Sequence, residues 1–185
     1  MNKTQKITVA GFGGQGVMMI GQMLAYAGSE DNLNSLWFPS YGPETRGGTA
    51  NCAVIISPKY INSPVFSKAD CLIAMNKPSL DKFINKVEDK GVILYNSSLI
   101  DGLTTNILHI GIPVNDIAAE LGNNKVINMV MMGAYLEVFN TFSEEVIEKV
   151  LRKILGPEKA GLVEVNIKAI NAGREFVRNL GVTNA

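Results

Sequence analysis

A glycine-rich segment near the N-terminus constrains the fold of this chain more than any other feature. The sequence GFGGQG occupies residues 11–16, directly after a short β-branched run at residues 6–10. Residues 17–27 follow and are apolar on almost every side, which predicts a buried helix. The G-x-G-x-x-G pattern is informative when a strand precedes it and a helix follows it, as here. The segment therefore predicts a tight strand-to-helix turn in an α/β fold.

The glycines of this turn have separate expected roles. Gly11 permits the turn, Gly13 lets the backbone approach a phosphate, and Gly16 lets the helix pack against the strand. Free amides at the helix start and the helix dipole favour an anionic group there. A dinucleotide site also requires an acidic residue at the end of the second strand, but Glu30 and Asp31 precede that strand. The segment thus predicts an anion site or a turn that binds nothing, and an NAD site lacks its second signature.

Short apolar runs predict further strands, at residues 33–38, 50–57, 71–75, 92–95 and 107–112. Most of these runs do not alternate cleanly, so we expect helices to cover them on both faces. Helical stretches are predicted at residues 79–87, 115–121 and 125–140. We therefore expect a single domain over residues 1–185. Its fold class is α/β, three-layer α/β/α with a mostly parallel (mixed) sheet and a Rossmann-like glycine loop after the first strand.

The connection between the second and third predicted strands is short. Residues 39–49 are rich in glycine and leave no room for a crossover helix. A parallel return needs roughly a dozen residues or more, usually including a helix. We therefore expect the third strand to run antiparallel, and we expect its connection to be an ordered binding loop.

Arg46 is the most unusual residue of that connection, SYGPETRGGT at residues 40–49. It is the only arginine in the first 151 residues, and Gly47 and Gly48 follow it. An arginine binds a carboxylate or phosphate through two parallel hydrogen bonds, which lysine does not reproduce. The expected role is a clamp on an anion or on a neighbouring subunit, and the alternative is an internal ion pair with Glu44.

Both glycine segments follow strands, so we expect them to meet at the carboxyl edge of the sheet, where α/β folds bind ligands. Asn76, Ser97 and Pro113 are expected along the same edge.

The C-terminal part of the chain has a different pattern. Residues 125–140 form a methionine-rich helix, which either packs in the core or docks another subunit. Residues 141–185 are richer in charge and predict exposed amphipathic helices. Glu145 with Lys149, and Glu148 with Arg152, have the spacing of ion pairs on one helix face.

Composition excludes several functional classes. Lysine plus arginine number 17 and aspartate plus glutamate number 17, so no global positive field favours nucleic acid. The longest uncharged apolar stretch, residues 129–136, is far shorter than the roughly 20 residues of a membrane span. We find no secretory signal and expect a cytoplasmic protein. Cys52, Cys71 and the single histidine, His109, are interpreted as packed side chains.

The two glycine motifs together resemble one known family. GFGGQGV at residues 11–17 and SYGPETRGGTANC at residues 40–52 are similar to the gamma subunit of the 2-oxoacid:ferredoxin (acceptor) oxidoreductases. The resemblance continues through ADCLIAM at residues 69–75 and NMVMMGA at residues 128–134, and so covers nearly the whole chain. The SYGPE-x-RGG form is most similar to 2-oxoglutarate-type gamma subunits.

The resemblance implies a multi-subunit enzyme that oxidatively decarboxylates a 2-oxoacid with thiamine diphosphate. It passes electrons through iron–sulfur clusters to ferredoxin or another acceptor and forms an acyl-CoA. This sequence has no thiamine–magnesium signature, no cluster-binding cysteines and no convincing catalytic acid–base pair. We therefore expect no catalytic residue and no metal ligand here, with thiamine diphosphate, magnesium and clusters in partner subunits and a coenzyme A contact on this chain.

The resemblance also implies candidate cofactor-binding residues. They are Gly11, Gly13, Gly14, Gln15 and Gly16 in the first motif, and Ser40, Tyr41, Gly42, Glu44, Arg46, Gly47 and Gly48 in the second. Whether the second motif contacts coenzyme A, thiamine diphosphate or a neighbouring subunit is left open. Three alternatives remain: a free-standing nucleotide-binding oxidoreductase, a purely structural assembly subunit, and an indolepyruvate-type oxidoreductase subunit.

Overall fold

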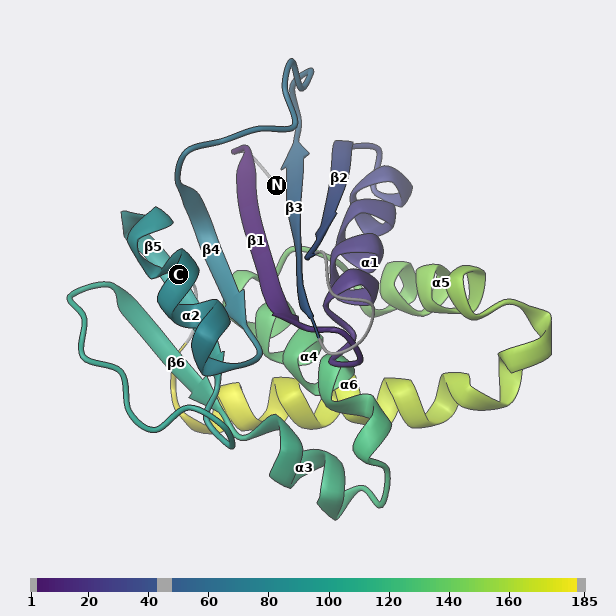
Figure 1. Cartoon of the computed structure of the whole chain (residues 1–185). Helices are drawn as coiled ribbons and strands as arrows, with labels where there is room; N and C mark the ends of the chain where they lie inside the picture. Colours follow the sequence, from purple (N-terminus) through teal and green to yellow (C-terminus); the bar gives the residue numbers. More distant parts are fainter. Residues whose placement is uncertain (1–2, 43–47, 183–185) are drawn as a thin grey trace.

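The computed structural model describes residues 3–42 and 48–182 and contains a six-stranded sheet in the order β2-β3-β1-β4-β5-β6 (Figure 1). The strands are β1 (Gln5–Phe12), β2 (Asn34–Tyr41), β3 (Thr49–Ser57), β4 (Ala69–Ala74), β5 (Val87–Asn96) and β6 (Leu108–Ile112). The α-helices are α1 (Val17–Glu30), α2 (Lys77–Phe83), α3 (Val114–Glu120), α4 (Ile127–Phe139), α5 (Glu144–Leu155) and α6 (Val163–Asn179). Three 3-10 turns, η1 (Ile84–Lys86), η2 (Asn124–Val126) and η3 (Pro157–Leu162), complete the described elements.

Strand β3 is antiparallel to both of its neighbours, β1 and β2, and the other pairings in the sheet are parallel. The mixed sheet and the reversed third strand are therefore confirmed. The short connection explains the reversal, because the Gly42 amide donates to the Thr49 carbonyl (2.7 Å) and continues the β2–β3 pairing.

This topology brings several distant segments to one edge of the sheet. The residues after β1, β2, β4, β5 and β6 lie there, together with those before β3. Asn76, Ser97 and Pro113 follow β4, β5 and β6, as expected. The carboxyl edge is therefore where residues far apart in the sequence meet.

The two faces of the sheet are covered unequally. Helices α1, α4, α5 and α6 contribute to the larger hydrophobic core on one face. On the other face, α2 packs against β1 and β4, and a smaller core forms around Leu72, Leu80 and Ile93. The α/β fold is confirmed, but among the described residues the second helical layer consists only of α2 and η1. Figure 1 shows no helix in front of β2 and β3.

The methionine-rich helix α4 lies in the core. Met129, Met131 and Met132 are fully buried, so the alternative that these side chains dock another subunit is wrong. The reason is the packing of α6 across α4. A Cβ atom on Gly133 would lie 1.9 Å from the Ile170 carbonyl oxygen, and one on Gly173 would lie 1.9 Å from the Val130 oxygen. The two helices approach so closely that only glycine fits at these two positions.

Helices α5 and α6 are amphipathic, as predicted. The pair Glu148–Arg152 is present, with Arg152 Nε 2.9 Å from Glu148 Oε1. Glu145 and Lys149 have the same spacing, but α5 packs against α1 and Lys149 instead reaches Glu30 on that helix (2.5 Å). The Lys149 ammonium lowers the pKa of the Glu30 carboxyl.

Both cysteines are buried and free, as interpreted from the sequence. Burial raises the pKa of Cys52 to about 11, so this thiol stays protonated at neutral pH. His109 Nδ1 donates to the Ile107 carbonyl (2.9 Å) and the imidazole lies near the Tyr95 ring, which agrees with a packing role. Across residues 3–42 and 48–182, the helices are too short or too polar to cross a bilayer.

Candidate functional site at the carboxyl edge

The first glycine segment forms the turn from β1 into α1. Gly14 (φ 95°) and Gly16 (φ 73°) adopt the left-handed conformations that make this turn. Gly11 instead lies within β1, and a Cβ there would be 2.8 Å from Val17 Cγ1 and 3.0 Å from Met75 Cβ. The expectation that Gly11 permits the turn is therefore wrong, because this residue provides close packing between β1, α1 and the end of β4.

Gly16 precedes the first residue of α1 and lies against helix α4, whereas we expected it to lie against the strand. A Cβ on Gly16 would lie 2.5 Å from both Cγ and Nδ2 of Asn128, near the start of α4. Asn128 is only 6% exposed, although the residues around it are apolar. Asn128 was not identified from the sequence as a site residue, and the usable signal was one amide in the apolar first half of α4. The first turns of α1 and α4 therefore meet at Gly16.

The side chain of Gln15 holds the glycine segment to the end of β4. Its Oε1 accepts hydrogen bonds from the Phe12 amide (2.8 Å) and from Asn76 Nδ2 (2.7 Å), and its Nε2 donates to the Met75 carbonyl (3.1 Å). The connection that leaves β1 leads to β2 on one side of the sheet, and the connection that leaves β4 leads to β5 on the other side. Doubly wound folds bind a pyrophosphate at such a point between neighbouring strands. Gln15 bridges that point and ties the turn after β1 to the residues after β4.

We expect Gln15→Leu to destabilise the fold. The substitution leaves the Phe12 amide, the Asn76 amide and the Met75 carbonyl without this partner, at about 1–3 kcal/mol for each buried group that stays unsatisfied. A net loss of about 2–4 kcal/mol should lower the melting temperature by roughly 5–15 °C, measured by thermal unfolding with circular dichroism. Gln22→Leu, on a half-buried position of α1, is the matched control. An unchanged melting temperature for Gln15→Leu would contradict the bridging role.

The second glycine segment lies directly beside the first. The Gly13 amide donates to the Gly48 carbonyl (3.0 Å), so the two predicted motifs are joined by a main-chain hydrogen bond. Ser40 and Tyr41 end β2 and are exposed, and Gly42 continues the hairpin. The juxtaposition of the two motifs, which the sequence predicted, is thus confirmed by the geometry of the described residues.

Three of the predicted site residues, Glu44, Arg46 and Gly47, lie outside the described residues. Their roles, including the alternative Glu44–Arg46 ion pair, stay predictions.

A row of polar side chains continues along the same edge toward β6. Asn96 is fully buried and donates to the Met75 carbonyl (3.3 Å) and to Asn115 Oδ1 (2.8 Å). The Ser98 hydroxyl donates to Asp116 Oδ2 (2.7 Å) at the start of α3. These side chains fix the loops after β4, β5 and β6 relative to one another, and they were not identified from the sequence.

The start of α1 has the chemistry of an anion site. Among the described residues no side chain caps this helix end, and no acidic residue lies in its first turn. Main-chain amides at a helix start and the positive end of the helix dipole both favour negative charge. Gly13 and Gly14 are exposed, so a ligand can reach the backbone of the turn. Within residues 3–42 and 48–182 no group of three or more histidine, cysteine, aspartate or glutamate side chains could hold a metal ion.

Comparison with known proteins identifies relatives over nearly the whole chain. The family model described as pyruvate ferredoxin/flavodoxin oxidoreductase matches residues 6–176. The ketoisovalerate oxidoreductase subunit VorA of Methanothermobacter thermautotrophicus is 36% identical over 173 residues, covering 94% of this chain and 36% of VorA. The 2-oxoglutarate synthase subunit KorC of Methanocaldococcus jannaschii is 33% identical over 181 residues, covering 95% of each chain. The chain therefore spans about a third of the length of VorA and nearly all of KorC.

Solved structures have the same fold. The gamma subunit of a keto/oxoacid ferredoxin oxidoreductase from Geobacter sulfurreducens superposes with a TM-score of 0.80 at 31% identity, over 95% of this chain and 99% of that one. The 2-oxoglutarate:ferredoxin oxidoreductase of Magnetococcus marinus gives a TM-score of 0.89 at 24% identity, over 100% of this chain and 32% of that one, which shows the fold alone. These matches confirm the resemblance that the two glycine motifs indicated. With both motifs joined at one edge of the predicted mixed sheet, the chain belongs to the pyruvate ferredoxin/flavodoxin oxidoreductase family.

Proposed function

We propose that this chain is the gamma subunit of a cytoplasmic, multi-subunit 2-oxoacid:ferredoxin (acceptor) oxidoreductase. It completes the site in which a 2-oxoacid is oxidatively decarboxylated to an acyl-CoA, and it holds neither thiamine diphosphate nor iron–sulfur clusters itself. The observation that carries this proposal is the end-to-end match to the Geobacter gamma subunit, which covers 95% of this chain and 99% of that one.

The glycine segments are proposed to contact coenzyme A through its phosphates. Coenzyme A carries a pyrophosphate and a ribose phosphate, and main-chain amides at a helix start suit such groups. The backbone of Gly14 and Gly16 offers these amides, since the Gly13 amide already donates to Gly48, and Asn128 adds a carboxamide beside them. Arg46 is proposed as the charged partner of a phosphate. The Magnetococcus relative was solved with 2-oxoglutarate, coenzyme A and succinyl-CoA bound, which is consistent with this role.

The partner subunits are proposed to supply the reactive cofactors. Thiamine diphosphate, when bound there, provides the electron sink for decarboxylation, and the clusters carry the released electrons to ferredoxin. The residues of this chain bind and orient the coenzyme A that accepts the acyl group.

The proposed substrate is 2-oxoglutarate. The match to KorC runs over 95% of both chains, whereas the match to VorA covers only 36% of VorA, so the division into subunits resembles that of KorC. The SYGPE-x-RGG form of the second motif supports the same substrate class.

Affinity purification of the tagged chain from its native cells tests this function. The expected result is co-purification of one subunit with a thiamine-binding signature and one with cluster cysteines. The purified complex should reduce ferredoxin in a reaction that requires coenzyme A, and faster with 2-oxoglutarate than with pyruvate or ketoisovalerate. A chain that purifies alone and binds NADH or NADPH would instead support the free-standing nucleotide-binding oxidoreductase.

Arg46→Ala tests the coenzyme A contact within the assembled enzyme. The loss of a charge-assisted hydrogen bond, about 1.5–3 kcal/mol, predicts a KM for coenzyme A about 10-fold to 100-fold higher. Arg152→Ala is the matched control, since Arg152 pairs on the surface with Glu148 of the same helix. If the Arg46→Ala complex assembles normally and keeps both the wild-type rate and the KM for coenzyme A, the proposed role of this residue is wrong.

A further inference from the structure

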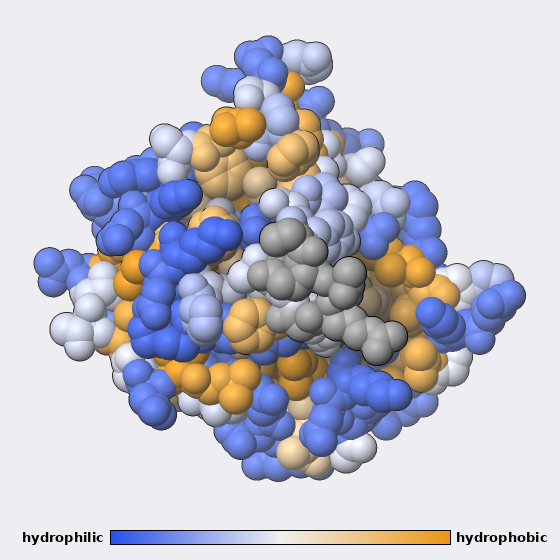
Figure 2. Space-filling view, viewed as in Figure 1, coloured by the Kyte–Doolittle hydropathy of each residue, from blue (hydrophilic) through white to orange (hydrophobic). Residues whose placement is uncertain are grey.

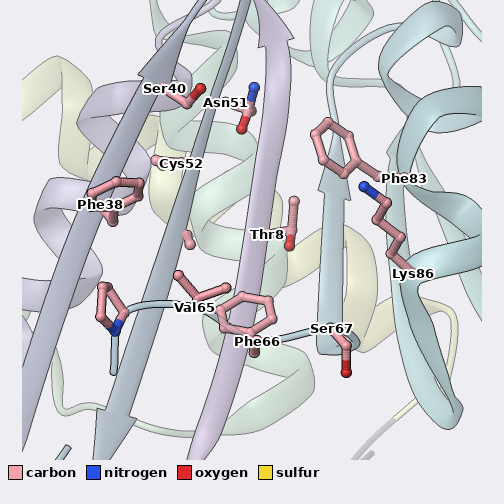
Figure 3. Close-up of a pocket in the computed structure, with 12 residues that line it drawn as sticks. Thr8, Phe38, Ser40, Asn51, Cys52, Val65, Phe66, Ser67, Phe83 and Lys86 are labelled. Carbon is pink, nitrogen blue, oxygen red and sulfur yellow. The ribbon is translucent and has the colours of Figure 1, made fainter. Parts of the chain in front are cut away.

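The sheet face opposite the main helical layer is open over β2 and β3. We call this surface the open face, and it displays Phe38, Ser40, Asn51, Ala53 and Thr8 (Figure 3). With residues 64–67 and with Phe83 and Lys86, these side chains line a groove of about 260 Å³. The strands β2 and β3 pair antiparallel, and antiparallel strands can leave one face free of covering helices.

The open face exposes large apolar side chains. Phe38 is 51% exposed at the groove, and Val65 and Tyr60 beside it are 74% and 81% exposed. Figure 2 shows apolar surface, in tan and orange, on the upper part of the same face with hydrophilic residues around it. Such side chains gathered on one face of a folded domain indicate a contact surface for another protein.

Lysines line both hollows of this face, and the half-buried Asp70 lies beside one of them, with its Oδ2 accepting from the Lys6 amide (2.8 Å). Lys86 lines the groove, and Lys6 and Lys59 line the adjoining hollow under residues 60–67. Among the residues that the structure describes, no aspartate or glutamate lines either hollow. The ammonium groups of Lys82 and Lys86 lie 5.4 and 5.6 Å from the centre of the Phe83 ring, so positive charge and an aromatic ring stand together at the rim.

Nearby lysines on the same side of the molecule already have partners. Lys68 pairs with Asp89 (3.3 Å), and Lys77 pairs with Asp81 on α2. The lysines that line the two hollows have no such ion pair within the described residues, although the chain as a whole has no net charge. The positive charge of the open face is therefore a local feature that carboxylates from another molecule would complement.

We propose that the open face is the docking surface for a neighbouring subunit of the oxidoreductase, and this inference rests on the proposed function. The matching surface carries apolar side chains at its centre, against Phe38 and Phe66, and aspartate or glutamate at its rim, against Lys86 and Lys59. A second copy of this chain fits poorly, because a two-fold interface would place lysines of one copy against lysines of the other.

Two substitutions test this surface in the tagged complex purified from native cells. Phe38→Asp places a carboxylate at the centre of the open face, and Lys86→Glu reverses a rim charge. Each is expected to lower the yield of co-purified subunits by about tenfold or more. Both residues are exposed, so the isolated variants should keep the wild-type melting temperature. Lys159→Glu, in the exposed turn between α5 and α6, is the matched control and should leave the yield unchanged.

Hydrogen exchange gives an independent readout on the wild-type complex. Residues 58–68 form no helix or strand, so their amides should exchange quickly in the isolated chain and several-fold more slowly after assembly. Normal yields for both variants, or protection confined to α5 and α6, would overturn the docking surface while leaving the proposed function intact. The docking surface would also be overturned if the isolated chain formed a dimer that Phe38→Asp dissociates. It would be overturned as well if both variants assembled and their only defect were in coenzyme A binding. A wild-type chain that retrieves no thiamine-binding subunit would overturn the proposed function and the docking surface together.

Discussion

Gly133→Ala is expected to destabilise the folded chain strongly. The added Cβ would lie 1.9 Å from the Ile170 carbonyl oxygen, which belongs to the backbone of α6 and cannot rotate away. Alanine favours a helix over glycine by about 1 kcal/mol, but moving one packed helix costs about 3 kcal/mol or more. The collision therefore outweighs the helix propensity. Because the free energy of unfolding of a folded protein is about 5–15 kcal/mol, the expected loss is a large fraction of the total stability.

The measurement is urea unfolding of the isolated chain, followed by circular dichroism. Gly161→Ala is the matched control, because a Cβ at Gly161 meets nothing within 4 Å. We expect the control to change the free energy of unfolding by less than about 0.5 kcal/mol. Equal stabilities for the two variants would contradict the close approach of α4 and α6 at Gly133.

Gly16→Ala is expected to impair coenzyme A binding by the assembled enzyme. The left-handed backbone of Gly16 (φ 73°) costs a residue with a side chain about 1–2 kcal/mol. The new Cβ would also overlap the side chain of Asn128 at 2.5 Å and push α1 and α4 apart at the proposed phosphate site. A misplaced helix start should raise the KM for coenzyme A by about tenfold or more, measured by steady-state kinetics.

Two further variants separate strain from collision and from ligand contact. Gly122→Ala introduces nearly the same backbone strain (φ 72°) in open space and should leave the KM unchanged. The double variant Gly16→Ala with Asn128→Ala removes two of the three overlapping atoms. This double variant should be more stable to unfolding than Gly16→Ala alone. Its KM for coenzyme A should stay high if the carboxamide of Asn128 contacts the ligand. A wild-type KM in Gly16→Ala would contradict a phosphate site at this turn.

Sequence reasoning recovered the parts of the site that depend on local structure. Glycine at positions 14 and 16 follows from the backbone of a tight turn, and the antiparallel β3 follows from a connection too short for a helix. The order of strands then requires both glycine segments to reach the carboxyl edge. Their contact through Gly13 and Gly48 is therefore a consequence of connectivity that the sequence could predict.

The errors concern side chains whose neighbours are remote in sequence. Gly11 was assigned to the turn because of its place in a motif, yet it is required by packing against Val17 and Met75. Lys149 has the right spacing to pair with Glu145, yet the nearby α1 offers Glu30. Spacing along one helix describes only the neighbours on that helix.

The sequence alone determined the α/β fold, the reversed third strand and the two glycine segments, because each depends on short stretches with strong backbone requirements. The tertiary structure alone decided that Asn128 meets Gly16, that Gln15 bridges β1 and β4, and that β2 and β3 keep an uncovered face. Packing brings together helices and strands that are remote in sequence, and no local pattern specifies which side chains then touch.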